Sequence, residues 1–181
     1  RAAEDSETPF MNVQDGFLTT HTIENVLLSE PEMMKHFIGA PDERLRNLMN
    51  PAMPVMSGVV QNQDSYMKGK IAQRHYYDQV MPAVENAMAE FYALTGRQYS
   101  LVHPYRLDDA EYAVVGSGGM METGEAAVDC IRKEMGIKVG LLHITSFRPW
   151  PSHQIVDALK HLKAVTVIER LDIPLQQSNP Q

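Results

Sequence analysis

Cysteine is nearly absent from this chain, which has one, Cys130, among 181 residues. A single thiol forms no internal disulfide, and it cannot hold an iron-sulfur cluster, which needs several thiolates. Basic side chains are also scarce, with 16 Lys and Arg against 23 Asp and Glu, and they form no cluster. A nucleic-acid site needs a concentrated positive charge, so the composition argues against nucleic-acid binding.

Long apolar runs are missing too. No segment approaches the roughly twenty apolar residues that a membrane-spanning helix requires. The first residues, RAAEDSETP, lack the charged and apolar regions of a signal peptide. We therefore expect no membrane span and a cytoplasmic, reducing setting. Because the first residue is Arg1 and not methionine, we also expect a processed or partial piece of a longer protein.

The six histidines that follow His21 in the sequence do not show the spacing of metal ligands. These are His36, His75, His103, His143, His153 and His161. None has a histidine partner four residues away and there is no HExxH pattern, so we expect no metal held by this chain. Cys130 follows Ala126 and Ala127 in a predicted helix, which indicates an inert, buried thiol.

Three short apolar runs alternate with two helical patterns in the last seventy or so residues. The runs at Tyr112–Val115, Lys138–Ile144 and Ala164–Ile168 are predicted strands, and Met120–Met135 and Ser152–Leu162 are predicted helices. Strands that are apolar throughout, with helices between them, are typical of a parallel sheet covered on both faces. The sequence therefore predicts a parallel βαβαβ domain.

A glycine-rich turn, with Gly116, Gly118 and Gly119, joins the first of these strands to its helix. A strand, glycines and a helix start together can bind a phosphate through exposed backbone amides. The lysine of phosphate-binding loops is missing, however, and the glycine spacing differs from the dinucleotide fingerprint. We favour a structural role, a tight strand-to-helix turn in which Ser117 or Glu122 satisfies the helix start.

The first half of the chain is predicted to be mainly helical after an initial strand. Apolar side chains around Asp15-Gly16 make Pro9–Thr22 a predicted buried strand that ends in a polar loop. A helical pattern follows over Asp64–Thr95, where Pro82 is expected to cause a kink or a junction near Met81. The polar stretch from Arg97 to Asp109 is predicted to be an interdomain connector.

The loop Thr19-Thr20-His21 is the best functional candidate, because it follows the predicted strand at its carboxyl end, where open α/β sheets bind ligands. A histidine there would position or relay a proton near neutral pH, and the hydroxyls would orient a carboxylate or diphosphate. We therefore name Thr20 and His21 as candidate cofactor-binding residues. The alternative stays open that Thr20 caps a helix starting near Thr22 and that His21 packs at an interface.

Two separated motifs carry a resemblance to a known family. The sequence GSGGMMETGEAAVDCIRKEMGIKVGLLHITSFRPWPSHQIVDALK, followed by VTVIERLDIPLQQSNP, resembles the transketolase C-terminal-like domain of 2-oxoacid:ferredoxin oxidoreductases, of which pyruvate:ferredoxin oxidoreductase is the best-known member. Upstream, PFMNVQDGFLTTHTIENV resembles the closing strand and loop of their thiamine-diphosphate-binding domain. The resemblance implies an α/β fold: residues 1–108 end the pyrimidine-side thiamine-diphosphate domain and add a long helical connector, and residues 109–181 form the transketolase C-terminal-like domain.

The resemblance also implies an activity. Such enzymes decarboxylate a 2-oxoacid, pyruvate first, on thiamine diphosphate, pass electrons through iron-sulfur clusters to ferredoxin or flavodoxin, and transfer the acyl group to coenzyme A. The family's glutamate would precede Arg1, and the GDG-type diphosphate motif is missing, since Asp-Gly occurs only in QDGF. Thiamine diphosphate, magnesium and the clusters would thus be held mainly by other segments or subunits. We name no catalytic residue and expect the chain alone to be inactive.

Three questions stay open at this stage. The sequence DGFLTTH, where single-chain bacterial enzymes tend to have DGFRTSH, is more similar to that of enzymes with a separate α-subunit. A cluster-free thiamine enzyme, such as a transketolase or the β-subunit of a 2-oxoacid dehydrogenase, shares the C-terminal fold. A third possibility is a non-catalytic docking and dimerisation module.

Overall fold

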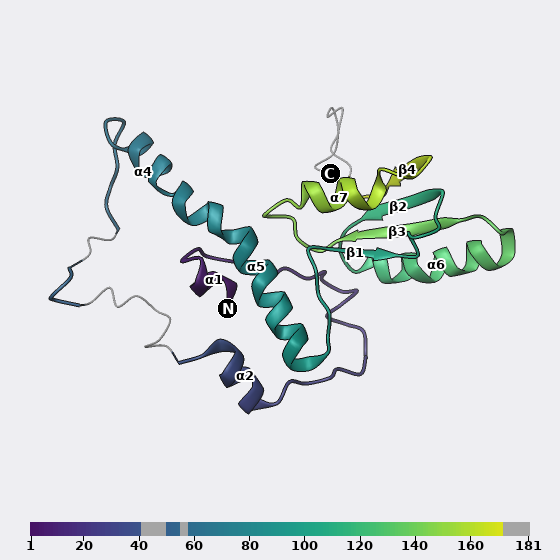
Figure 1. The fold of residues 1–181 in the computed structure, drawn as a ribbon, viewed down its shortest axis with the longest axis horizontal. Coiled ribbons are helices and arrows are strands. Elements are labelled where there is room, and N and C mark those ends of the chain that lie inside the picture. Colours follow the sequence, from purple (N-terminus) through teal and green to yellow (C-terminus); the bar gives the residue numbers. More distant parts are fainter. Residues whose placement is uncertain (41–49, 55–57, 172–181) are drawn as a thin grey trace. The chain divides into compact units, whose positions relative to one another are not determined.

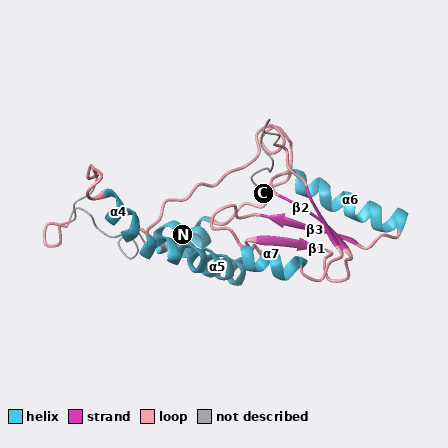
Figure 2. Ribbon diagram, turned by 90° about the horizontal axis from the view of Figure 1, so that it is seen from above, coloured by secondary structure: helices cyan, strands magenta, loops and turns pink. Residues whose placement is uncertain are grey.

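The computed structural model describes residues 1–40, 50–54 and 58–171. The chain divides into two compact units. The first consists of Arg1–Met11 and Asn25–Gln98, and the second of Asn12–Glu24 and Tyr99–Gln181. Within the described residues the first unit is helical and the second contains a sheet, as Figures 1 and 2 show. The protein is therefore an α/β protein.

The sheet of the second unit has the strand order β1-β3-β2-β4 (Figure 1). Strand β2 (Tyr112–Gly116) pairs in parallel with both β3 (Val139–Ile144) and β4 (Ala164–Val167). Helix α6 (Met120–Met135) follows β2, and helix α7 (Ser152–Leu159) follows β3. The parallel βαβαβ arrangement predicted from the sequence is confirmed, although α7 ends earlier than predicted.

Both faces of this sheet are covered. Neighbouring residues of each central strand point to opposite faces and therefore pack in different clusters. Leu141 of β3 is fully buried in a cluster with Met121 and Val128 of α6. Leu142, the next residue, is fully buried in a second cluster, against which side chains of the α7 region pack. These side chains are Trp150, Ile155, Ala158, Leu159 and Leu162. Figures 1 and 2 show α6 and α7 on opposite faces of the strands.

The prediction that Cys130 is a buried thiol is wrong, because its side chain is exposed. The buried residues of α6 are Met121 and Val128, seven residues or about two turns apart. Cys130 is two residues beyond Val128, which turns it by roughly 200° to the far side of the helix. Ala126 and Ala127 are exposed as well, so these two alanines do not belong to the face of α6 that packs in the core.

The predicted connector from Arg97 to Asp109 also requires a correction, because it contains a strand. Strand β1 (Val102–Tyr105) pairs antiparallel with β3, with His103 opposite His143. Pro104 within it argues against a central strand, but β1 is an edge strand, where a missing N–H donor is tolerated.

The helices of the first unit are α1 (Ala2–Asp5), α2 (Pro31–Ile38), α4 (Tyr66–Ala72) and α5 (Arg74–Thr95) (Figure 1). The predicted helical segment is confirmed, but of the kink or junction expected near Met81, the junction is wrong and the kink stays a prediction. The two helices meet at Gln73, and α5 continues through Pro82. A proline removes one backbone donor, and the hydrogen bonds of the surrounding turns suffice to hold α5 together.

The end of α5 and its packing follow the sequence more closely. Gly96 is left-handed, with a φ of 72°, and its N–H donates to the carbonyl of Tyr92, so it is the C-cap of α5. Val80 and Val84 are the buried residues of α5. Phe91 meets Phe37 of α2 edge to face at 5.3 Å between ring centroids, and Arg1 forms an ion pair with Glu90 at 2.9 Å.

The predicted buried strand over Pro9–Thr22 is absent. The segment has no regular strand pairing, and Met11, Val13 and Phe17 are 86%, 76% and 78% exposed. An apolar alternation forms a strand only where a neighbouring strand supplies hydrogen bonds, and no other described residues pair with this one.

Each helix in the described part of the chain is too short or too polar to cross a lipid bilayer.

Candidate functional site

A cavity of about 670 Å³ lies at the carboxyl end of the parallel strands of the second unit. Four segments line it: Val13, Gln14, Asp15 and Thr19; Ser117–Met120 with Glu122 after β2; His143–Thr145 with Phe147 after β3; and Glu169–Leu171 after β4. This edge is where open parallel sheets bind their ligands, because the loops that follow the strands converge there. It is the candidate site of this chain.

The loop and the glycine turn of this cavity are joined by one side chain. The carboxylate of Asp15 accepts a hydrogen bond from the backbone N–H of Gly119, the N-cap residue of α6. The two residues are 104 positions apart in sequence. A negative charge at a helix N-terminus is favourable, because the first amides of the helix point outwards and carry partial positive charge.

The glycine residues form the tight strand-to-helix turn that the sequence predicts, but the partner of this turn was not predicted. Gly118 has a left-handed φ of 82°, which a residue with a side chain rarely adopts. A Cβ atom added to Gly118 would lie 2.9 Å from Asp15 Oδ2, and one added to Gly119 would lie 2.8 Å from it. Asp15 therefore serves the helix start, a partner that the sequence did not suggest beside Ser117 and Glu122. The lack of a capping residue at Gly119 itself was the available signal.

Thr20 and His21 form a compact turn next to this cavity. Thr20 Oγ1 accepts a hydrogen bond from the N–H of Phe17 at 3.0 Å and lies 2.8 Å from His21 Nδ1. The His21 ring lies 4.8 Å from that of Phe17, measured between centroids. Both Thr20 and His21 are exposed, and Thr19, not they, lines the cavity. Their role in cofactor binding stays a prediction.

The alternative role proposed for Thr20 is wrong. No helix begins near Thr22, so Thr20 caps none. The hydroxyl of Thr22 instead donates to the carbonyl of Leu18, which closes the turn around Gly16–Thr22.

A pair of histidines lies on the sheet beneath α6. His143 lines the cavity and faces His103 across the β1-β3 pair. His103 Nε2 is 3.3 Å from Glu125 Oε1 of α6. Burial lowers the pKa of His143 below its ordinary value, and the nearby His103 lowers it further, while Glu125 and Glu122 oppose the shift. The lowered pKa favours the neutral imidazole, which can donate one hydrogen bond and accept another.

The residues of the cavity do not fit a diphosphate or its magnesium ion. Asp15 already occupies the helix start, where a phosphate would bind. Glu122 and Glu169 add two more carboxyl groups against one arginine, Arg170. Within the described part of the chain, no group of three His, Cys, Asp or Glu side chains is arranged to hold a metal ion.

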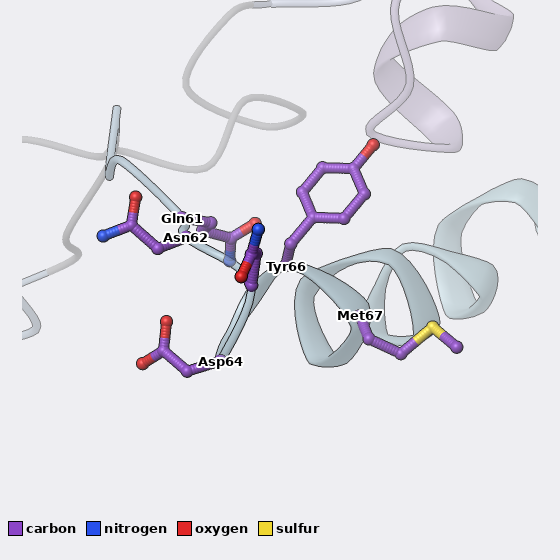
Figure 3. Close-up of a pocket in the computed structure, with 6 residues that line it drawn as sticks. Gln61, Asn62, Asp64, Tyr66 and Met67 are labelled. Carbon is purple, nitrogen blue, oxygen red and sulfur yellow. The ribbon is translucent and has the colours of Figure 1, made fainter.

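A second hollow, of about 740 Å³, lies in the first unit beside the start of α4 (Figure 3). Its lining residues are Gln61, Asn62, Gln63, Asp64, Tyr66 and Met67. All are exposed, and in Figure 3 Asp64, Tyr66 and Met67 point in different directions. A binding site needs polar groups that converge, so this hollow is a surface recess.

Two protein families match the chain in order. Residues 1–89 match "Pyruvate flavodoxin/ferredoxin oxidoreductase, thiamine diP-bdg". Residues 110–179 match "Pyruvate:ferredoxin oxidoreductase core domain II".

Individual relatives align with nearly the whole chain. A pyruvate-flavodoxin oxidoreductase of Klebsiella pneumoniae is 33% identical over 99% of the chain, which covers 16% of that protein. Pyruvate synthase subunit PorA of Methanosarcina barkeri is 32% identical over 94% of the chain, and that of Thermotoga maritima is 35% identical over 92%. The chain spans 42% of each of these two subunits, so it is less than half as long as the relatives it matches.

Proposed function

The chain belongs to the family of pyruvate:ferredoxin and pyruvate:flavodoxin oxidoreductases, and we propose that it works as a part of such an enzyme. The whole enzyme oxidatively decarboxylates a 2-oxoacid on thiamine diphosphate and transfers the acyl group to coenzyme A. Its electrons pass through iron-sulfur clusters to ferredoxin or flavodoxin. Pyruvate is the proposed substrate, ahead of 2-oxoglutarate, branched-chain and aryl 2-oxoacids.

One observation carries this proposal: a thiamine-diphosphate-binding family and a core domain of the same enzymes match consecutive parts of the chain. The relatives whose names include pyruvate align with both parts of the chain. The sequence identity of the chain to the flavodoxin enzyme, 33%, is similar to that to the two PorA subunits, 32% and 35%. A shared C-terminal fold alone would fit other thiamine enzymes equally well. The match of the first part is what favours the oxidoreductase.

The chain's own contribution is proposed to be architectural at one edge of the cofactor cleft. Thiamine diphosphate would supply the carbanion chemistry. Thr20 and His21 are proposed to orient the cofactor or substrate by hydrogen bonds from the hydroxyl and the imidazole. The magnesium-diphosphate half and the clusters are assigned to other segments or subunits, because the cavity is acidic and one exposed cysteine cannot ligate a cluster.

The experiment that tests the activity uses the full gene, expressed without oxygen together with its neighbouring genes. The purified complex should reduce ferredoxin or flavodoxin with pyruvate only when coenzyme A is present, and should show the visible absorption of iron-sulfur clusters. The other 2-oxoacids, assayed at equal concentration, decide the substrate. Thiamine-dependent turnover without cluster absorption would place the protein among cluster-free thiamine enzymes instead. A cofactor-loaded complex without any turnover would favour a docking module.

The division of labour can be tested on the isolated chain. Titration calorimetry with thiamine diphosphate and magnesium should detect no binding, because one side of the cleft is all that the chain would offer. The assembled enzyme is the positive control. Micromolar binding by the chain alone would show that it holds the diphosphate site.

A further inference from the structure

We propose that Asp15 is a positioning residue: its carboxylate, bound to the Gly119 amide at the start of α6, fixes the turn that carries Thr20 and His21. The proposal rests on the proposed function in one respect, that this turn serves the cofactor or substrate. The contact itself is independent of that function. Both partners belong to the second compact unit, so the contact is internal to it.

The turn after Asp15 is connected to the rest of the unit by few other groups. Its backbone hydrogen bonds are local: Leu18 N–H donates to the carbonyl of Gly16 at 2.7 Å, and His21 N–H donates to the carbonyl of Phe17 at 3.1 Å. Phe17 and Leu18, its apolar side chains, are 78% and 49% exposed. Local hydrogen bonds fix the conformation of such a turn, but its position relative to the sheet depends on the contacts of the residue that precedes it. Asp15, half-buried, is the residue that bonds to the helix.

The two glycines provide the second line of support. A tight strand-to-helix turn requires one glycine, at Gly118, because its φ is 82°. Gly119 has an ordinary helical φ of −61°, which alanine adopts without strain. Its Cβ would nevertheless lie 2.8 Å from Asp15 Oδ2 and 3.6 Å from Thr19 Oγ1. Gly119 is therefore explained by the close approach of the Asp15 loop and not by its own backbone.

Charge strengthens the same contact. The carboxylate meets the positive end of a 16-residue helix, whose last turn carries Arg132 and Lys133 at the opposite end. An ionised acceptor at a helix start forms a stronger hydrogen bond than a neutral one. Asparagine is a comparably good capping residue, so Asp15→Asn keeps the hydrogen bond and loses the charge. Asp15→Ala loses both.

The test compares four single variants in the assembled enzyme. They are Asp15→Ala, Asp15→Asn, Gly119→Ala and Asp108→Ala. Asp108 is an exposed aspartate of the same unit, so its replacement controls for the loss of one charge. Hydrogen exchange of residues 16–22, followed by mass spectrometry, reports the position of the turn. Turnover with the 2-oxoacid at full cofactor loading reports its consequence.

The expected results separate the contact from general stability. Asp15→Ala should speed exchange in residues 16–22 by roughly tenfold, as for the loss of a helix cap, and should lower kcat with cluster absorption unchanged. Asp15→Asn should keep most of the protection from exchange and most of the parent kcat, and Asp108→Ala should match the parent in both measurements. Gly119→Ala should loosen the turn although Asp15 is intact, and adding it to Asp15→Ala should cause little further loss, because both changes remove one contact.

Two outcomes would overturn the proposal. One is unchanged exchange in residues 16–22 in both Asp15→Ala and Gly119→Ala. The other is a loss of kcat that Asp15→Asn does not restore, which would make the charge itself the functional group. If Asp15→Ala does not assemble, Gly119→Ala supplies the same comparison. A parent complex with no 2-oxoacid oxidation would refute the proposed function, while the exchange results would still decide the contact.

Discussion

The sheet of the second unit and the segment of residues 10–28 both contain many apolar residues, but they behave in opposite ways. Leu141 and Leu142 in β3 are 0% exposed, whereas Met11 and Phe17 are 86% and 78% exposed. The strands of the sheet find hydrogen-bonding neighbours within the chain, and their side chains meet α6 and α7. No strand of the described sheet pairs with the segment, and its apolar side chains are mostly exposed. Apolar composition therefore predicts burial only where the chain itself supplies the partner.

The exposed segment is expected to be covered in the assembled enzyme. Its exposed apolar side chains include Phe10, Met11, Val13, Phe17, Ile23, Val26, Leu27 and Leu28. We expect this because contiguous exposed apolar groups are typical of contact surfaces. The comparison can be tested by variants whose effects should differ between the two regions.

The largest expected difference is between Leu141→Ala and Phe17→Ala. Removing the buried side chain of Leu141 should lower the free energy of unfolding of the chain by about 3 kcal/mol, because it leaves a cavity among Met121, Val128 and Val139. Phe17→Ala should change it by less than about 0.5 kcal/mol. Urea unfolding followed by circular dichroism measures both. Equal losses would show that the segment packs in the isolated chain.

A second pair of variants adds a methyl group instead of removing one. A Cβ added to Gly124 would lie 2.5 Å from Leu141 Cδ1, whereas one added to Gly16 would meet nothing within 4 Å. Gly124→Ala should destabilise the chain by about 1–3 kcal/mol through overpacking, although alanine favours the helix by about 1 kcal/mol. Gly16→Ala should be close to neutral. A stabilised Gly124→Ala variant would mean that α6 moves freely on the sheet.

The same contrast explains how much the sequence could predict. The strands and helices from Tyr112 to Val167 were predictable because each has a continuous apolar pattern and its partners follow in the chain. Strand β1 was missed, since Pro104 and His103 hide an edge strand that only its pairing with β3 defines. The strand at Pro9–Thr22 was predicted wrongly, because the pattern is there and the partner is not.

The candidate site was predictable in part for a similar reason. The loop with Thr20 and His21 and the glycine turn each stand out in the sequence. Their connection through Asp15 does not, because it joins residues 104 positions apart. An acceptor for the helix start could be expected, but nothing local identifies which carboxylate supplies it.

The exposed loop is where stability and function should separate. In the assembled enzyme, His21→Ala or Thr20→Val should lower the rate constant with the 2-oxoacid by about tenfold or more, or ~1.4 kcal/mol in the barrier, as for a group that orients cofactor or substrate. Assembly and cluster content should stay normal. The matched control is His153→Ala, an exposed histidine on α7. Parent-like kinetics at full cofactor loading would make the loop structural.

The smallest expected effect is a pH dependence that belongs to the sheet and not to the exposed loop. Burial, and then His103, lower the pKa of His143 from its ordinary value of 6.5, while Glu125 and Glu122 limit the shift. The unfolded chain then binds a proton at a higher pH than the folded chain does. The free energy of unfolding should therefore fall as the pH is lowered through 6.5 towards the folded-state pKa, and level off below it.

This dependence should be lost in His143→Gln and kept in His153→Gln, whose replaced side chain is exposed. Urea unfolding at a series of pH values on either side of 6.5 measures the difference between each variant and the parent. Carboxyl groups titrate at lower pH and are common to all three proteins, so they cancel in that difference. A parent and His143→Gln variant with parallel pH profiles would show that the imidazole is as well hydrated in the sheet as in the unfolded chain.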